Sequence, residues 1–165
     1  MIFTKEKDVP KPKLTLAGKE IEWVAHYKYL GVKLDENLNW TQHINNIVKK
    51  ANVTMLQCKT MIRRNYGLSP KVCKWIYQGM ILSVLTYGST VWIYATRNKK
   101  LMKKLEKVQR NCMMAATNST NSTPTAGLQV IRNIRAIDIQ IQETALYAYT
   151  RMVKMEHGKF NKEKF

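Results

Sequence analysis

Acidic side chains are scarce in this sequence and missing from its middle. The 165 residues include 28 Lys or Arg but 11 Asp or Glu, which gives a formal net charge of +17. No Asp or Glu lies between Glu36 and Glu106, a stretch that holds twelve Lys or Arg. A solvated helical surface usually mixes both signs, because like charges three or four residues apart repel each other. A chain that accepts this repulsion often has a polyanion as its partner, and the pattern favours nucleic acid.

Cysteine and long apolar runs are also scarce. Cys58, Cys73 and Cys112 are an odd number without paired spacing, so neither a disulfide framework nor a zinc site is indicated, and we expect buried, reduced thiols. The first residues lack the apolar core of a signal peptide, and the most apolar run, residues 75–87, is shorter than the ~20 residues that span a bilayer. These absences predict an intracellular protein, nuclear or cytoplasmic, with no membrane partner.

Residues that could carry catalysis are missing as well. The three Asp lie in unrelated elements, and the adjacent pair Asp35 and Glu36 falls in a strand-to-helix turn, where capping is the expected role. The three His have no metal-ligand spacing. Neither a Gly-rich phosphate loop nor a nucleophile with a base is present. The residues alone predict a binding module with no active site, metal or cofactor.

The apolar residues present are enough for a core, since they make up 45% of the chain and include four Trp. The first 38 residues show β patterns. Leu14 and Leu16 alternate with a polar residue, residues 17–19 supply a turn, and alternation resumes at Ile21. A third strand is expected over residues 27–34, with Gly31 inside it as a bulge or a point of close approach.

Helical spacing replaces this alternation after residue 38. The first helix should end near residues 65–67, and Ser69 and Pro70 should begin a second that runs to about Ala95, interrupted, if anywhere, at Gly79 or Gly88. Thr96 should open a third helix, a short one should reach Ile131, and the last should span residues 137–154. The first helix has one apolar stripe: Trp40, Ile44, Ile47, Val48, Ala51, Met55, Cys58 and Ile62. The last should turn Ile137, Ile141, Ala145, Ala148 and Met152 inward.

The third helix has two chemically distinct sides. At ~100° per residue, its apolar residues fall within a narrow arc and its cations within roughly 140° on the far side. The apolar residues are Leu101, Leu105, Val108 and Cys112. The cations are Lys99, Lys100, Lys103, Lys104, Lys107 and Arg110. This geometry predicts a nucleic-acid-binding face, with a merely solvated basic face as the alternative.

The fold class is therefore predicted to be α+β. A short N-terminal antiparallel hairpin or three-strand element should occupy residues 1–38. A mainly helical bundle should follow over residues 39–157, and a frayed tail should occupy residues 158–165.

Four strings of residues resemble non-LTR (LINE-type) retrotransposon reverse transcriptases, especially the jockey-like elements of arthropods. Their order and spacing hold from about Ile2 to Met152. They are residues 27–35 (YKYLGVKLD) with the LNW and HI that follow, residues 81–92 (ILSVLTYGSTVW), residues 107–110 (KVQR) and residues 122–128 (STPTAGL).

The resemblance implies that Tyr29, Leu30 and Gly31 belong to a primer-grip hairpin that holds the growing DNA end. It implies further that the helices from Trp40 onward are the thumb and its connector, which track an RNA/DNA template-primer. The polymerase palm and fingers would then be partners. Such contacts would go mainly to the phosphate backbone, which carries little sequence information.

The departures from the family are informative too. The family's catalytic Tyr-x-Asp-Asp is absent, so Mg²⁺ is expected only in the complete polymerase. Arg135 and Ala136 replace the family's proline pair, so we expect the connection before the last helix to differ in shape. The chain is thus interpreted as a fragment that cannot polymerise DNA by itself.

Two alternatives remain open at this point. One is an autonomous helical nucleic-acid-binding protein, and the other is a protein-interaction bundle whose basic face meets an acidic partner. Displacement of the partner by an RNA–DNA hybrid would favour the two nucleic-acid interpretations, the polymerase fragment and the autonomous binding protein, over the protein-interaction bundle.

Overall fold

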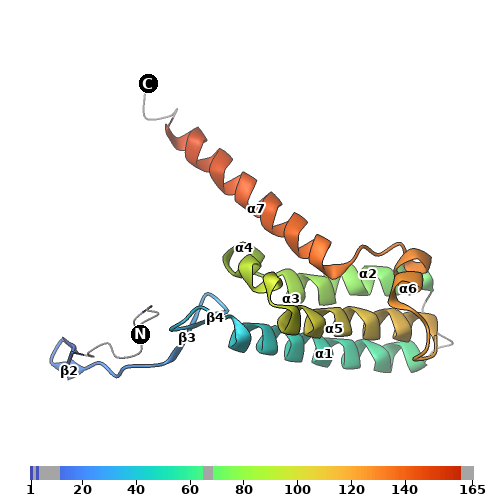
Figure 1. Ribbon diagram of the computed structural model, residues 1–165, viewed down its shortest axis with the longest axis horizontal. Coiled ribbons are helices and arrows are strands. Elements are labelled where there is room, and N and C mark those ends of the chain that lie inside the picture. Colours follow the sequence, from blue (N-terminus) through green and yellow to red (C-terminus); the bar gives the residue numbers. More distant parts are fainter. Residues whose placement is uncertain (2, 4–11, 65–68, 161–165) are drawn as a thin grey trace. The chain divides into compact units, whose positions relative to one another are not determined.

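The computed structural model of this chain describes residues 1, 3, 12–64 and 69–160. The chain divides into two compact units, Met1–Asn45 and Asn46–Phe165. The first contains two β-hairpins and the beginning of a helix, and the second is built of helices (Figure 1). The fold class is α+β, as the sequence predicts. The division falls inside helix α1 (Thr41–Arg64), and the domain boundaries at residues 38 and 157 stay predictions.

The first hairpin pairs strand β1 (Thr15–Leu16) with strand β2 (Lys19–Glu20) in antiparallel fashion. Ala17 and Gly18 form its turn with φ values of 49° and 77°. Two consecutive positive φ values give the turn a twist that matches the paired strands. The predicted turn is confirmed, but the strands are short. All four strand residues are exposed, so the hairpin has no buried face that would stabilise a longer pairing.

The second hairpin corrects the single strand expected over residues 27–34. Strand β3 (His26–Tyr29) reverses into strand β4 (Val32–Asp35), and Tyr29 pairs with Val32. Leu30 and Gly31 form the two-residue turn with φ values of 45° and 85°. Gly31 is therefore neither a bulge nor a mid-strand residue, because its left-handed conformation reverses the chain.

The corner between β4 and α1 is held by the Asp35 carboxylate. Its two oxygens accept the backbone N–H groups of Asn39 and Trp40, at 3.2 and 3.3 Å. Trp40 itself has a positive φ of 61°, a conformation that a bulky side chain rarely adopts without support from its surroundings. Both N–H groups belong to residues that precede α1, so Asp35 holds the turn before the helix, and a helix-capping role for it stays a prediction.

His43 fastens the second hairpin to the start of α1. Its imidazole is fully buried, and its Nδ1 accepts the backbone N–H of Lys33 at 3.3 Å. The Trp40 ring meets the imidazole edge-on, with 6.4 Å between ring centroids. The β-hairpin and the helix start therefore share one small core.

Helix α1 follows its predicted apolar stripe. Ile44, Ile47, Ala51 and Cys58 are buried, while Val48 and Met55 are half-buried. The side chain of Ile62 and the predicted helix end at residues 65–67 lie outside the described residues.

The segment expected to be helical from Pro70 to about Ala95 is interrupted at one of the two glycines predicted for a break, and it is not one regular α-helix. Ser69 caps its start as expected, accepting the Val72 N–H at 3.4 Å. The chain then forms five shorter elements: α2 (Pro70–Ile76), the π-helical η1 (Tyr77–Leu82), α3 (Ser83–Thr86), α4 (Ser89–Trp92) and the 3₁₀-helical η2 (Ile93–Arg97). The break falls at Gly88, whose φ of 64° is left-handed, whereas Gly79 stays helical.

The next helix, α5 (Lys99–Thr117), begins three residues after the expected Thr96, which lies in η2 instead. Asn98 is the actual cap, and its side chain accepts the Lys100 N–H at 3.0 Å. Helix α6 (Thr125–Arg132) follows a polar loop, and α7 (Ile137–Phe160) ends the described chain. Figure 1 shows α5 alongside α2, with α6 near the end of α5.

The core of the helical unit lies where α5 and α7 meet the short helices. Leu105, Leu85, Trp92 and Ile141 have no exposed surface. Ala145 is also buried, but Met152 is 49% exposed, so its predicted inward position is wrong. Helix α7 contacts α3, α4, α5 and η2. Its later turns extend beyond these helices (Figure 1). None of the described helices is long and apolar enough to cross a membrane.

Trp40, in the small core of the second hairpin and the start of α1, and Trp75 of α2 provide a matched test of the assigned burial. Trp40 is 8% exposed and Trp75 is 70% exposed. Trp40→Ala should lower the free energy of unfolding by ~3–5 kcal/mol, because it empties a packed site. Trp75→Ala should cost less than about 0.5 kcal/mol. Urea unfolding followed by circular dichroism measures both, and equal losses would contradict the assigned burial.

Candidate nucleic-acid interface

The lysines of α5 lie on its solvent side. The five are all exposed: Lys99, Lys100, Lys103, Lys104 and Lys107. Leu101, Leu105 and Val108 are buried on the opposite side, and Met102 and Met113 are buried as well. The two-sided geometry predicted from the sequence is therefore present. We call these five lysines the α5 lysine face.

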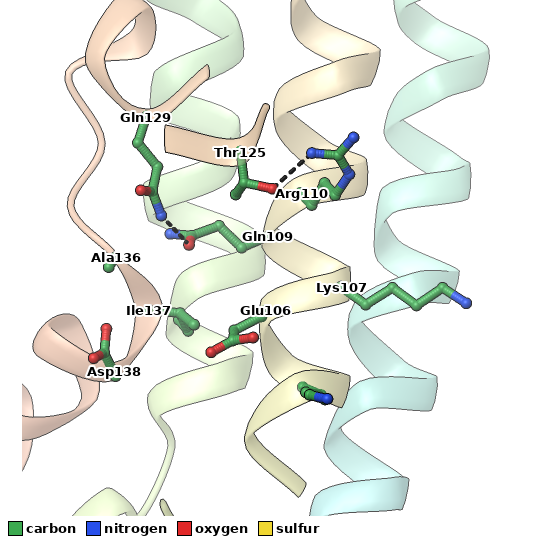
Figure 2. Close-up of a pocket in the computed structure, with 10 residues that line it drawn as sticks. Glu106, Lys107, Gln109, Arg110, Thr125, Gln129, Ala136, Ile137 and Asp138 are labelled. Atoms are coloured by element: carbon green, nitrogen blue, oxygen red, sulfur yellow. Dashed lines mark hydrogen bonds between the residues drawn. The ribbon is translucent and has the colours of Figure 1, made fainter. Parts of the chain in front are cut away.

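Arg110 occupies a different environment from these lysines. It is half-buried, and one terminal nitrogen donates to Thr125 Oγ1 at 2.6 Å (Figure 2). The other terminal nitrogen donates to the Asn121 carbonyl at 2.8 Å. These bonds fasten the polar loop and the start of α6 to α5. A guanidinium has five N–H donors, so Arg110 can make these structural bonds and still contact a ligand. Its place in the predicted nucleic-acid-binding site stays a prediction.

Gln109 forms the centre of a buried hydrogen-bond network that the sequence analysis missed. It is 1% exposed, and its Nε2 donates to the Tyr77 hydroxyl at 2.9 Å and to the Arg135 carbonyl at 2.8 Å. Its Oε1 accepts from Gln129 at 3.3 Å. The Tyr77 hydroxyl in turn donates to Gln140 Oε1 at 3.1 Å. The network joins η1, α5, α6 and α7.

The protonation state of Tyr77 suits this role. Burial raises the pKa of the Tyr77 phenol well above its ordinary value, although the hydrogen bond from Gln109 acts in the opposite direction. The phenol therefore remains protonated and can donate to Gln140. A signal for the network exists in the sequence, since Gln109 is four residues from both Leu105 and Met113 and so shares their buried side.

A groove of about 410 Å³ lies between α5, α6 and the start of α7 (Figure 2). Lys103, Lys107 and Arg110 contribute to its wall, but so do the carboxylates of Glu106 and Asp138. Figure 2 shows the Lys107 side chain extending away from Asp138. Because the groove mixes both signs, a phosphate would be attracted more strongly to the α5 lysine face than to its interior.

The other predicted site residues lie at the tip of the second hairpin. Tyr29 and Leu30 are 60% and 74% exposed, and Gly31 is half-buried. These three residues belong to the Met1–Asn45 unit, and the α5 lysine face belongs to the other unit.

The two aspartates that the structure describes have structural positions. Asp35 accepts backbone N–H groups in the turn before α1, and Asp138 lies in the first turn of α7, where the helix dipole favours a negative charge. Asp8 lies outside the described residues. Within residues 12–64 and 69–160, no group of three or more His, Cys, Asp or Glu could hold a metal ion.

The three cysteines are buried thiols, as the sequence predicts. Burial raises the pKa of the Cys58 thiol, so this sulfur is a poor nucleophile. Its S–H donates to the Met80 sulfur at 4.0 Å. These thiols therefore act as small apolar side chains of the core.

The chain is homologous to the Pol proteins and RNA-directed DNA polymerases of non-LTR retrotransposable elements. It is 23% identical over 128 residues, 74% of this chain, to a retrovirus-related Pol polyprotein from the type-1 retrotransposable element R1 3 of Nasonia vitripennis. It is 23% identical over 140 residues, 85% of this chain, to the corresponding R1 polyprotein of Bradysia coprophila. The RNA-directed DNA polymerase from mobile element jockey of Drosophila melanogaster is 30% identical over 100 residues, 59% of this chain. The predicted resemblance is confirmed at this level.

The match covers a small part of each relative. The chain spans 33%, 14% and 10% of the lengths of these three proteins, respectively. No protein-family model matches the chain. No solved structure matches it either.

The Gln109 network can be tested without any ligand. Gln109→Leu keeps a similar volume but leaves the Arg135 carbonyl and the Gln129 amide without this partner, and it removes the bond to Tyr77. The free energy of unfolding should fall by about 1–3 kcal/mol. Gln142→Leu, on an exposed position of α7, is the control and should leave the urea midpoint nearly unchanged. Equal midpoints for both variants would show that the network contributes nothing.

Proposed function

We propose that this chain is the part of a retrotransposon RNA-directed DNA polymerase that holds template-primer nucleic acid, with α5 in the role of a basic thumb helix. The observation that carries the proposal is the α5 lysine face, exposed on a helix whose opposite side is buried. The names of the relatives, Pol polyproteins and RNA-directed DNA polymerases, supply the class of activity.

Electrostatics supports a polyanionic ligand. Lys99 and Lys100 lie in the first turn of α5, where the helix dipole disfavours positive charge. Lys99, Lys103 and Lys107 are also spaced at four residues, so their like charges repel one another along the helix. A sugar-phosphate backbone placed along this side would neutralise both terms and release its own condensed counterions.

The chemistry of nucleotide transfer would come from elsewhere in such a polymerase. The sequence contains no Tyr-x-Asp-Asp, and the described residues offer no cluster of metal-ligating side chains. We therefore propose that this chain positions nucleic acid, has no polymerase active site of its own and needs no cofactor. The palm and fingers that hold Mg²⁺ would be its partners.

The hairpin tip is the second part of the proposal. Tyr29, Leu30 and Gly31 correspond to the primer-grip segment of the resemblance, and the tight turn presents Tyr29 and Leu30 to solvent. An exposed, rigid turn can press against a strand end without rearrangement. We propose that this tip meets the primer strand.

The lysine proposal predicts a change in salt dependence. Replacing Lys99, Lys100, Lys103 and Lys107 by Gln should weaken binding to several unrelated duplexes and RNA–DNA hybrids alike. The slope of log affinity against log salt should fall by about three to four units, at ~0.9 per phosphate contact. Arg110 is left intact because its change would also release the polar loop from α5. Fluorescence anisotropy over a range of salt concentrations measures the slope.

The control removes the same charge elsewhere. Lys13, Lys19, Arg151 and Lys154 are exposed and lie outside α5. Their replacement by Gln should leave most of the slope in place. If the slope of log affinity against log salt falls equally in both quadruple variants, binding responds to net charge alone and the proposed face is wrong.

A further inference from the structure

A stacked pair of side chains lies just before α5. Tyr94 and Arg97 are three residues apart in the 3₁₀ helix η2, whose repeat of three places them on the same side. The Arg97 guanidinium carbon lies 5.1 Å from the centre of the Tyr94 ring, within the range of a cation–π contact. The Tyr94 side chain is nevertheless 69% exposed, so the pair covers little of the ring.

This pair is joined closely to the α5 lysine face. Asn98 alone separates η2 from α5, and it is fixed at both ends. Its backbone N–H donates to the Ala95 carbonyl at 3.0 Å, and its side chain caps α5. Arg97 and Lys99 are therefore held near each other by a rigid connection.

The surroundings of the pair are basic and partly apolar. Val91, three residues before Tyr94, is 51% exposed. The sequence around η2 contains no acid that could pair with Arg97, Lys99 or Lys100 along the chain. Exposed aromatic rings interleaved with cations are the arrangement with which proteins bind unpaired bases, because every base has a flat face and a phosphate beside it.

We propose that Tyr94 and Arg97 form a stacking platform for an unpaired base in a single-stranded extension of the bound duplex. The base would lie against the open part of the Tyr94 ring or the Arg97 guanidinium plane, and Lys99 and Lys100 would neutralise the adjoining phosphates. This inference rests on the proposed function, because the duplex itself would occupy the α5 lysine face. It adds a ligand, single-stranded nucleic acid, and a site for it.

The test compares two probes that differ only in the extension. One is a blunt RNA–DNA hybrid, and the other is the same hybrid with a short single-stranded end that contains the fluorescent base 2-aminopurine. Wild-type chain should bind the extended hybrid more tightly and quench its fluorescence, because stacking quenches this base. Tyr94→Ala should lose about tenfold in affinity for the extended hybrid and keep its affinity for the blunt one. Tyr94→Phe should retain both affinities, since the ring remains.

The control for a general loss of exposed aromatic surface is Tyr147→Ala. Tyr147 is 72% exposed on α7, and its change should alter neither affinity. Arg97→Gln is a second variant that leaves the ring in place, and it should reduce the preference for the extended hybrid.

The outcomes separate this inference from the proposed function. If wild type and Tyr94→Ala show the same ratio of the two affinities, the platform is wrong while the lysine face stands. If the extension gives no quenching and no added affinity in wild type, the platform is likewise wrong. If the wild-type chain binds neither probe, both proposals fail together.

Discussion

The structure depends on the burial of one side of α5. Leu101, Leu105 and Val108 lie in the core. Gln109 of the same helix is hydrogen-bonded to η1, to α6 and to the Arg135 carbonyl in the connection between α6 and α7. Apolar burial alone would tolerate a small rotation of the helix, but the directional bonds of Gln109 would not. A rotation large enough to bury the lysines would also remove several charges from water, at a cost of several kcal/mol for each. The position of the lysines is thus set by the core beneath them.

Because of this constraint, the packing residues and the charged residues lie on opposite sides of α5. The buried core lies on the other side of α5 from the lysines. Lys99 and Lys100 lie in the first turn of α5, against the helix dipole, and lysines four residues apart repel one another. Exposed like charges of this kind are expected where a ligand supplies the compensating charge. The homology to retrotransposon RNA-directed DNA polymerases is one reason why we propose nucleic acid as this ligand.

Several elements could be predicted because one local pattern decided them. The apolar stripe of α1, the two sides of α5, the turn at Ala17 and Gly18, and the cap at Ser69 each follow from spacing or from one residue's conformational preference. The longer-range features could not be predicted in this way. Leu30 is a poor turn residue by itself, so the hairpin at Gly31 looked like a continuous strand.

The candidate site shows the same difference. The α5 lysine face follows from helical spacing alone, but the use of Arg110 depends on where the polar loop returns, and that is a tertiary contact. The break at Gly88 depends on the Trp92 indole, which donates to the Tyr87 carbonyl at 2.9 Å and is completely buried. Gln109 could have been identified, since its spacing from Leu105 and Met113 places a polar group on an apolar side, but its partners could not.

The most direct test of the central claim is a lysine-reactivity footprint. Limited acetylation of the chain, with and without an RNA–DNA hybrid, can be followed residue by residue by mass spectrometry. The account predicts that the hybrid protects Lys99, Lys103 and Lys107, while Lys13, Lys19 and Lys154 react as before. Protection spread evenly over all six, or none at the α5 lysine face, would contradict it.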